Sequence, residues 1–118
     1  MSISRAIPTP IHGAIEVFLA PAIMALPFIL ELGPVAVAVG LVLGAVMLGS
    51  ALSLVGERRT VSLSAHAGFD YALAYVALFT GVAIGIAGDI PAMIFMVGVG
   101  AAQAALTANT RFSLPRGA

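Results

Sequence analysis

Residues 34–55 read PVAVAVGLVLGAVMLGSALSLV, a stretch without a single charged side chain. An apolar segment of about 20 residues is long enough to cross the hydrocarbon core of a bilayer as a helix. Three further segments have similar character, so the sequence predicts four transmembrane helices, at about 10–30, 34–55, 64–86 and 91–107. The breaks between them are short, and two of them combine glycine with proline, ELGP at 31–34 and GDIP at 88–91. Such breaks favour a tight turn between neighbouring helices, which predicts two helical hairpins.

The composition of the whole chain agrees with a membrane protein. Of its 118 residues, 61% are hydrophobic and only 8% are charged, and the mean hydropathy is +1.14. Ordinary soluble domains are less apolar. Five arginines balance five acidic residues, so no strong field attracts nucleic acid, and we expect no nucleic-acid partner. The absence of cysteine excludes disulfides, thiolate catalysis and cysteine-ligated metals.

The basic residues define the expected orientation. They all lie near the two ends or in the middle loop: Arg5, Arg58, Arg59, Arg111 and Arg116. The other two loops contain only Glu31 and Asp89 as charged residues. By the positive-inside rule, both termini are expected on the cytoplasmic side of a multi-pass protein. We expect no cleaved signal peptide, because His12 and Glu16 interrupt the first apolar segment.

The two halves of the chain resemble each other. A shift of fifty-four residues superposes similar positions: His12 on His66, Glu16 on Asp70, Ala20 on Ala74, Gly44 on Gly98 and Ser53 on Thr107. The sequence therefore predicts one membrane domain, 1–118, made of two tandem hairpins, repeat 1 at about 8–55 and repeat 2 at about 62–110. Since each repeat crosses the membrane an even number of times, we expect an all-α four-helix bundle with a pseudo two-fold axis along the membrane normal.

The duplicated polar pairs are the candidate functional residues. The chain has two histidines, and each precedes an acidic residue by four positions, which places the pair on one face of its helix. Both pairs lie in the first turns of helices that are expected to begin at the cytoplasmic side, and Gln103 reaches the same depth from the fourth helix. The candidate polar or ion site therefore comprises five residues: His12, Glu16, His66, Asp70 and Gln103.

Three interpretations of this cluster stay open at the level of the sequence. In the first, each pair is structural, with a carboxylate near the positive end of a helix and Thr9 or Ser64 as helix-start residues. In the second, the side chains form a proton- or cation-binding site, because intramembrane acids and histidines recur in such sites. In the third, two histidines and two carboxylates hold a divalent metal such as zinc, or His12 and His66 ligate a haem.

Small residues at four-residue spacing predict close helix packing. Glycine lets two helix backbones approach, so pairs of small residues one turn apart mark the expected contacts between helices. The candidate packing glycines are Gly40 and Gly44 on the second helix, Gly81 and Gly85 on the third, and Gly98, paired with Ala102, on the fourth.

Residues 7–30, IPTPIHGAIEVFLAPAIMALPFIL, resemble the start of the hairpin unit in the SPW-repeat family of small bacterial membrane proteins. The shared features are an Ile-Pro-Thr lead, a His-Gly pair, an acid four residues after the histidine and a Pro-aromatic step. Phe28 follows Pro27 where the family tends to have tryptophan, and Glu16 replaces the more usual aspartate. The second copy has Gly81 and Val82 at the Pro-aromatic step. The resemblance covers both halves and implies this fold in a bacterial cytoplasmic membrane, but it implies no reaction.

The sequence has no recognisable catalytic setting. No nucleophile stands in a triad pattern and no glycine loop has phosphate-binding spacing, so we expect a non-enzymatic protein with no catalytic residue, no cofactor and no assigned metal. The preferred function is a structural, assembly or accessory component of the membrane. Its expected partners are the lipid bilayer and either further copies of the chain or other membrane proteins. The alternative is proton or cation handling by the candidate site, and the second alternative is metal or haem binding by His12 and His66.

Overall fold

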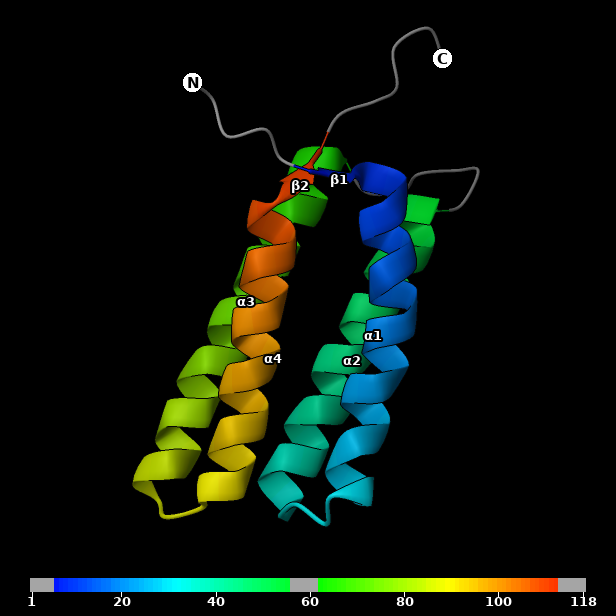
Figure 1. Ribbon diagram of the computed structural model, residues 1–118. Helices are drawn as coiled ribbons and strands as arrows, with labels where there is room; N and C mark the ends of the chain where they lie inside the picture. Colours follow the sequence, from blue (N-terminus) through cyan, green and yellow to red (C-terminus); the bar gives the residue numbers. More distant parts are fainter. Residues whose placement is uncertain (1–5, 56–61, 113–118) are drawn as a thin grey trace, which may run out of the picture.

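The computed structural model describes residues 6–55 and 62–112, which form four long helices and two very short strands (Figure 1). In chain order the elements are β1 (Ile7–Pro8), α1 (Thr9–Ile29), α2 (Pro34–Val55), α3 (Leu63–Ile86), α4 (Ile90–Ala108) and β2 (Thr110–Arg111). Within these residues, each of the four helices is long and apolar enough to cross a membrane. The prediction of an all-helical protein with four such helices is therefore confirmed.

The helices are arranged as two antiparallel hairpins, α1 with α2 and α3 with α4 (Figure 1). Each hairpin turns through one residue with a positive φ angle. After α3 this residue is Gly88, at +103°, in agreement with the glycine stop that the sequence predicts. After α1 it is Glu31, at +53°, and Gly33 instead directly precedes Pro34 at the start of α2. Both turns lie at the end of the molecule opposite the chain termini (Figure 1).

Close packing within each hairpin depends on glycines. A Cβ atom added at Gly44 would lie 2.8 Å from the carbonyl oxygen of Ala20, and one at Gly40 would lie 3.0 Å from the ring of Pro27. In the second hairpin, added Cβ atoms at Gly81 and Gly85 would lie 2.8 Å and 2.3 Å from side chains of α4. These four predicted packing glycines therefore lie where α1 meets α2 and where α3 meets α4.

The prediction for the fifth glycine is wrong. A Cβ atom at Gly98 would meet no atom within 4 Å, whereas one at Gly100 would lie 2.8 Å from the carbonyl oxygen of Ala74. The prediction came from the four-residue spacing of Gly98 and Ala102, which does not show which face of the helix meets its neighbour. The uniform shift that superposes Gly98 on Gly44 also fails in the second half of the hairpin, because α3 has 24 residues and α1 has 21.

The buried positions of the two hairpins correspond when this length difference is taken into account. In α1 and α3 they are offset by fifty-four residues: His12 and His66, Glu16 and Asp70, Ala20 and Ala74, Ile23 and Ala77, Pro27 and Gly81. In α2 and α4 they are offset by fifty-six: Ala36 and Ala92, Gly40 and Met96, Gly44 and Gly100, Met47 and Gln103, Ala51 and Thr107. The three extra residues of α3 and a connection that is one residue shorter account for the difference.

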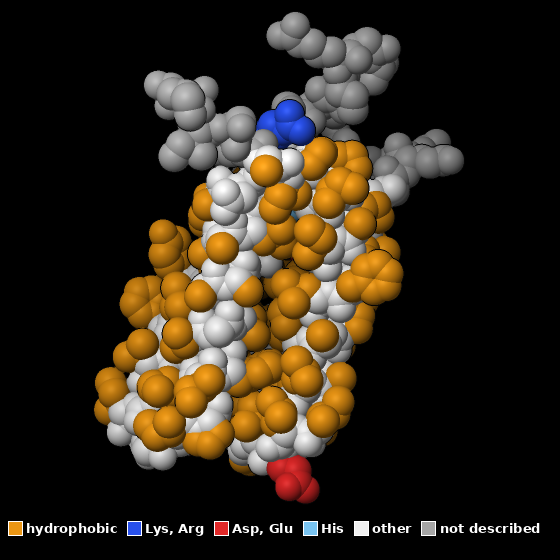
Figure 2. All heavy atoms as spheres, in the orientation of Figure 1, with side chains coloured by type: hydrophobic (Ala, Val, Ile, Leu, Met, Phe, Trp, Pro, Cys, Tyr) orange, Lys and Arg blue, Asp and Glu red, His pale blue; other side chains and the backbone are white. Residues whose placement is uncertain are grey.

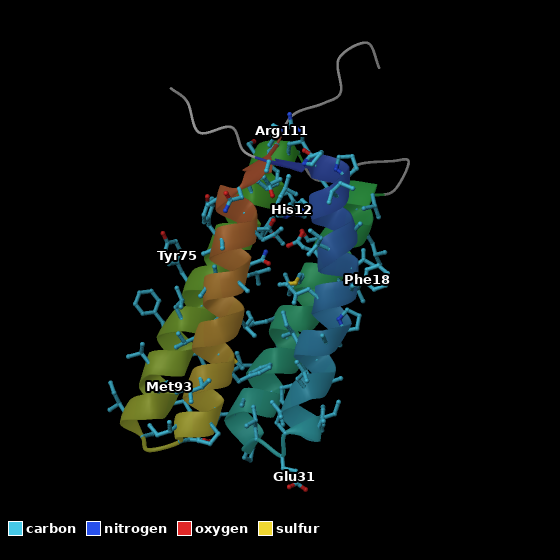
Figure 3. The ribbon with its side chains drawn as sticks, in the orientation of Figure 1. His12, Phe18, Glu31, Tyr75, Met93 and Arg111 are labelled. Carbon is cyan, nitrogen blue, oxygen red and sulfur yellow. The ribbon has the colours of Figure 1, made fainter. Side chains whose placement is uncertain are left out.

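Apolar side chains cover the helical surface from one end of the molecule to the other (Figure 2). Many of them are large and well exposed, such as Phe18 at 80% and Ile86 at 84%. Charged side chains lie at the ends, with Arg111 beside the chain termini and Glu31 at the hairpin turns (Figure 3). The buried apolar core is built mainly from alanines and a few larger residues, including Ile23, Met47 and Met96. The molecule is thus apolar on its sides and polar at its ends. One group of polar side chains lies in its otherwise apolar interior.

Candidate functional site

Four polar side chains converge in the interior, near the end of the bundle that carries the chain termini. His12 and Glu16 come from the first two turns of α1, and His66 and Asp70 come from the equivalent turns of α3. The four-residue spacing places both members of each pair on the face of the helix that points into the bundle. Their relative exposures are 0%, 0%, 1% and 0%, so water does not reach them from the surface.

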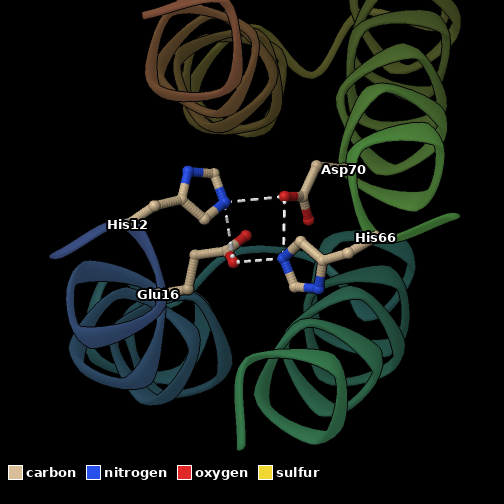
Figure 4. A group of neighbouring side chains, drawn as sticks. All are labelled: His12, Glu16, His66 and Asp70. Carbon is tan, nitrogen blue, oxygen red and sulfur yellow. Dashed lines mark hydrogen bonds and ion pairs between the residues drawn. The ribbon is translucent and has the colours of Figure 1, made fainter. Parts of the chain in front are cut away.

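These side chains form a closed ring in which histidine and carboxylate alternate (Figure 4). His12 Nε2 lies 2.7 Å from Asp70 Oδ2 and 3.0 Å from Glu16 Oε1. His66 Nε2 lies 3.0 Å from each of the same two oxygens. Each carboxylate therefore contacts the histidine of its own helix and the histidine of the other hairpin. We call these four residues the His/carboxylate ring.

The proton on one side of the His12 ring is fixed by its neighbours. The Thr110 hydroxyl donates its single proton to the carbonyl oxygen of Leu106, at 2.6 Å. The same hydroxyl oxygen lies 2.7 Å from His12 Nδ1, so it must accept there, and Nδ1 carries a proton. His12 Nε2, which faces the two carboxyl groups, then either carries a second proton, giving an imidazolium, or has a lone pair. The lone pair can accept from a protonated carboxyl group or bind a cation.

Further polar groups surround the ring. The Gln103 amide donates from Nε2 to Glu16 Oε2 at 2.7 Å, and Ser50 Oγ lies 2.9 Å from His66 Nδ1. Three buried atoms have no hydrogen-bond partner among the described residues: Asp70 Oδ1, Gln103 Oε1 and Thr107 Oγ1. Buried polar atoms are nearly always paired, so these atoms indicate that water or an ion takes part in the site.

Charge balance restricts what this ring can contain. Two carboxylates with no access to water cost several kcal/mol each unless positive charge compensates them. Arginine does not do so among the described residues, because Arg111 is exposed. The ring is neutral with two imidazolium groups, with two protonated carboxyl groups beside neutral histidines, or with one divalent cation beside two carboxylates and two neutral histidines.

The ring is covered on the side of the chain termini and closed by apolar residues on the other. Phe112 packs over it, with its ring centroid 5.0 Å from that of His12 and 6.1 Å from that of His66. On the opposite side, the next buried residues along α1 and α2 are Ala20, Ile23 and Met47. The ring is therefore a polar layer within an otherwise apolar interior.

The structure brings together all five residues of the candidate site, because Gln103 contacts Glu16 directly. The expected helix-start residues behave differently. Ser62, not Ser64, caps α3 by accepting from the Ala65 N–H at 3.1 Å, and the prediction for Ser64 is wrong because α3 begins one residue earlier than expected. Thr9 donates its hydroxyl proton to the carbonyl oxygen of Arg111. Helix capping is thus carried out by residues outside the ring.

Sequence reasoning missed Thr110 and Phe112, which follow the last helix. No periodic pattern marks them, and their contacts with His12 span about a hundred positions of the chain. The two tyrosines near Asp70 have no place in the site: Tyr71 and Tyr75 are 37% and 57% exposed, and Tyr75 points away from the bundle (Figure 3).

The geometry of the ring distinguishes between the two expected ligands, a haem and a single metal ion. A haem between His12 and His66 does not fit, because both Nε2 atoms lie within 3.0 Å of the same two carboxylate oxygens, which occupy the space that the porphyrin would need. A single metal ion fits far better. One ligand atom from each of the four residues lies within 4.8 Å of all the others, and all four residues are buried.

Comparison with protein-family models, curated proteins and solved structures found no match. The resemblance to the SPW-repeat family therefore stays a prediction, and the chemistry of the site is argued from its own residues.

Proposed function

We propose that this protein is an integral membrane protein that binds one divalent transition-metal cation of the zinc class in the His/carboxylate ring. The four ligands are Nε2 of His12 and His66 and one carboxylate oxygen each of Glu16 and Asp70. This is the second alternative of the sequence analysis, metal binding by His12 and His66, with Glu16 and Asp70 as further ligands. We place it ahead of a purely structural or assembly role. Its surface stays available for contacts with lipid or with other membrane proteins, and we propose no catalytic activity.

The membrane location is supported by the surface as well as by helix length. Large apolar side chains are exposed all along the helices, which water would disfavour and lipid tails would not. Arg111 lies at the end of the molecule that carries the chain termini, and Glu31 lies at the other (Figure 3). Together with the other arginines of the sequence, this distribution favours cytoplasmic termini, in the bacterial cytoplasmic membrane that the family resemblance implies.

The correspondence of buried positions supports a tandem duplication with an approximate two-fold axis. At the level of the ring, equivalent positions of the two hairpins have the same type of side chain, since His12 corresponds to His66 and Glu16 to Asp70. In this view, each repeat contributes one histidine and one carboxylate, and the metal lies on the axis between the repeats. A site of this kind forms only when the two hairpins are packed together.

The convergence of four ligand atoms on one buried point is the observation that carries the proposal. Neighbouring atoms of the ring are 2.7 to 3.0 Å apart. Zinc bonds to nitrogen and oxygen are about 2.0 to 2.2 Å, which puts the ligands of a tetrahedral site roughly 3.4 Å apart. Neighbouring atoms of the ring would have to separate by about 0.4 to 0.7 Å. One divalent ion would neutralise both carboxylates.

The surrounding hydrogen bonds support a metal as well. Histidine that ligates a metal usually donates its other N–H to an oxygen acceptor, which fixes the ring and leaves the lone pair on the metal side. His12 has this arrangement with Thr110, and the non-ligating oxygen of Glu16 accepts from Gln103. Ligating carboxylates are commonly held in this way.

The test is metal binding by the purified protein in mild detergent. After treatment with a chelator, titration with Zn²⁺ should give one ion per chain, and Co²⁺ should give the visible absorption of a four-coordinate site, a readout that does not depend on activity. Glu16→Gln should weaken binding on the order of 100-fold or more, since it removes a charged ligand. Glu31→Gln is the matched control, because Glu31 lies in the turn at the far end of the molecule. The proposal fails if the wild-type protein binds neither ion stoichiometrically, or if the two variants bind alike.

A further inference from the structure

The two ends of the described chain cross over the His/carboxylate ring and are joined to each other. β1 and β2 pair in parallel, with Ile7 opposite Thr110 and Pro8 opposite Arg111. The Ile7 N–H also donates to the carbonyl oxygen of Asn109 at 3.0 Å. We call residues 7–9 and 110–112 the terminal strap.

The terminal strap contacts both histidines of the ring. Thr110 accepts from His12 Nδ1, and the Phe112 ring meets the His12 ring edge to face, at an interplanar angle of 67°. The same phenyl ring lies beside His66. An ion in the ring therefore has the strap between it and the space beyond the chain termini.

Toward the hairpin turns, the described residues offer no polar path. On that side, the buried layer next to the ring contains Ala20, Ile23, Met47, Ala74 and Ala77, each at most 1% exposed. A cation that crossed this layer would lose its hydration without gaining a ligand, at a cost of many kcal/mol. The sides of the bundle are apolar and, in our proposal, face lipid. The strap, which covers the ring on the side of the chain termini, carries polar groups that contact it.

We propose that the terminal strap is the gate of the metal site. The ion enters and leaves on the side of the chain termini when β2 separates from β1 and Phe112 moves away from the two histidines. Opening breaks only a two-residue strand pairing and a few side-chain contacts, so it needs no unfolding of the helices. This inference rests on the proposed function, because it concerns the regulation of the same site.

A reversible cross-link across the strap tests the gate. Pro8 and Arg111 are paired in the strands, whose spacing of about 4.8 Å suits a disulfide. The chain has no cysteine of its own, so Pro8→Cys with Arg111→Cys creates a single defined bond. Zn²⁺ release to an excess of chelator is then measured by stopped flow on the oxidised form and on the reduced form of the same protein. The thiols of the reduced form are first blocked with a small alkylating reagent, because free thiols would themselves bind Zn²⁺. Gly33→Cys with Asp89→Cys, at the hairpin turns, provides a cross-link at the far end as the control.

We expect oxidation of the strap pair to slow Zn²⁺ release at least tenfold, and oxidation of the far-end pair to leave it unchanged. Equal release rates for the oxidised and reduced strap would overturn the gate while leaving the metal site intact. If the reduced protein binds no Zn²⁺ at equilibrium, both the gate and the proposed function are wrong.

A second variant acts in the opposite direction without a cross-link. Phe112→Ala removes the phenyl ring that covers the two histidines, and we expect Zn²⁺ release to become at least tenfold faster. Phe18→Ala is its control, since that phenylalanine is 80% exposed on the outer surface of α1. Release from Phe112→Ala at the rate of Phe18→Ala would count against the gate.

Discussion

The contact between α3 and α4 can be tested with two glycines of α4, Gly98 and Gly100, because their surroundings differ completely. Gly100 faces the backbone of α3, whereas Gly98, two residues earlier, faces open space. Replacing each glycine by alanine adds the same methyl group at the two positions. We expect Gly100→Ala to destabilise the protein and Gly98→Ala to leave its stability unchanged or to raise it by up to about 1 kcal/mol.

The size of the effect follows from the distances around the added methyl group. At Gly100 its carbon would lie 2.8 Å from the carbonyl oxygen of Ala74 and 2.7 Å from Cγ of Leu78, whereas ordinary contacts begin at 3.4 Å. The backbone oxygen cannot turn aside, so α4 must move away from α3 by roughly 0.6 Å, and overpacking of this kind typically costs about 1–3 kcal/mol. At Gly98 nothing opposes the methyl group, and the better helix propensity of alanine contributes up to about 1 kcal/mol in favour of the folded state.

The measurement is the free energy of unfolding of the wild-type protein and both variants. Each is titrated from a mild detergent into sodium dodecyl sulfate, and the loss of tertiary structure is followed by near-ultraviolet circular dichroism of the tyrosines. Equal stabilities for the two variants, or a larger loss for Gly98→Ala, would refute the packing register of α4 against α3 described above.

Three further predictions concern the helix cap, the hydrogen bond to Glu16 and the metal. Ser62→Ala removes the side-chain cap of α3 and should lower the free energy of unfolding by about 1 kcal/mol, whereas Ser64→Ala should change it little; the same detergent titration compares them. Gln103→Met should weaken Zn²⁺ binding by about 10- to 100-fold without loss of helix content, because Glu16 loses the donor to its second oxygen. Removal of metal by a chelator should lower the free energy of unfolding. Addition of Zn²⁺ at about 100 times its Kd should raise that free energy again by roughly 2.7 kcal/mol. An unchanged free energy of unfolding after Zn²⁺ is added would argue against a metal-bound native state.

Much of the fold could be predicted from the sequence because the rules involved are local. An apolar segment of membrane-spanning length must form its hydrogen bonds within itself, so its length and its glycine and proline breaks predict the helices. The same locality places His12 one turn before Glu16, and His66 one turn before Asp70, at the same level of the bundle. Four of the five packing glycines were also predicted, because small residues one turn apart on an apolar helix let a neighbouring backbone approach closely.

Other features depend on lengths that local rules do not fix. The uniform shift between the two hairpins does not hold in α4, because three extra residues in α3 and a shorter turn put Gly100, and not Gly98, at the packing position. The start of α3 was placed one residue too late, so the cap was predicted at Ser64 when Ser62 provides it. A difference of one or two residues rotates a helix face by more than a quarter turn, which is enough to exchange a buried position for an exposed one.

The sequence by itself determined that two histidines and two carboxylates lie at one level of an apolar four-helix protein, since helix length and four-residue spacing are properties of neighbouring residues. Only the tertiary structure decided that the pairs face each other, that His12 meets Asp70 at 2.7 Å, and that Thr110 and Phe112 cover them. These contacts join residues that are separated by 46 or more positions in the chain, the smallest separation being that of His66 and Phe112 (112 − 66 = 46). They depend on how the two hairpins pack against each other. That packing is determined by van der Waals contacts between many small side chains, and no single sequence motif specifies it.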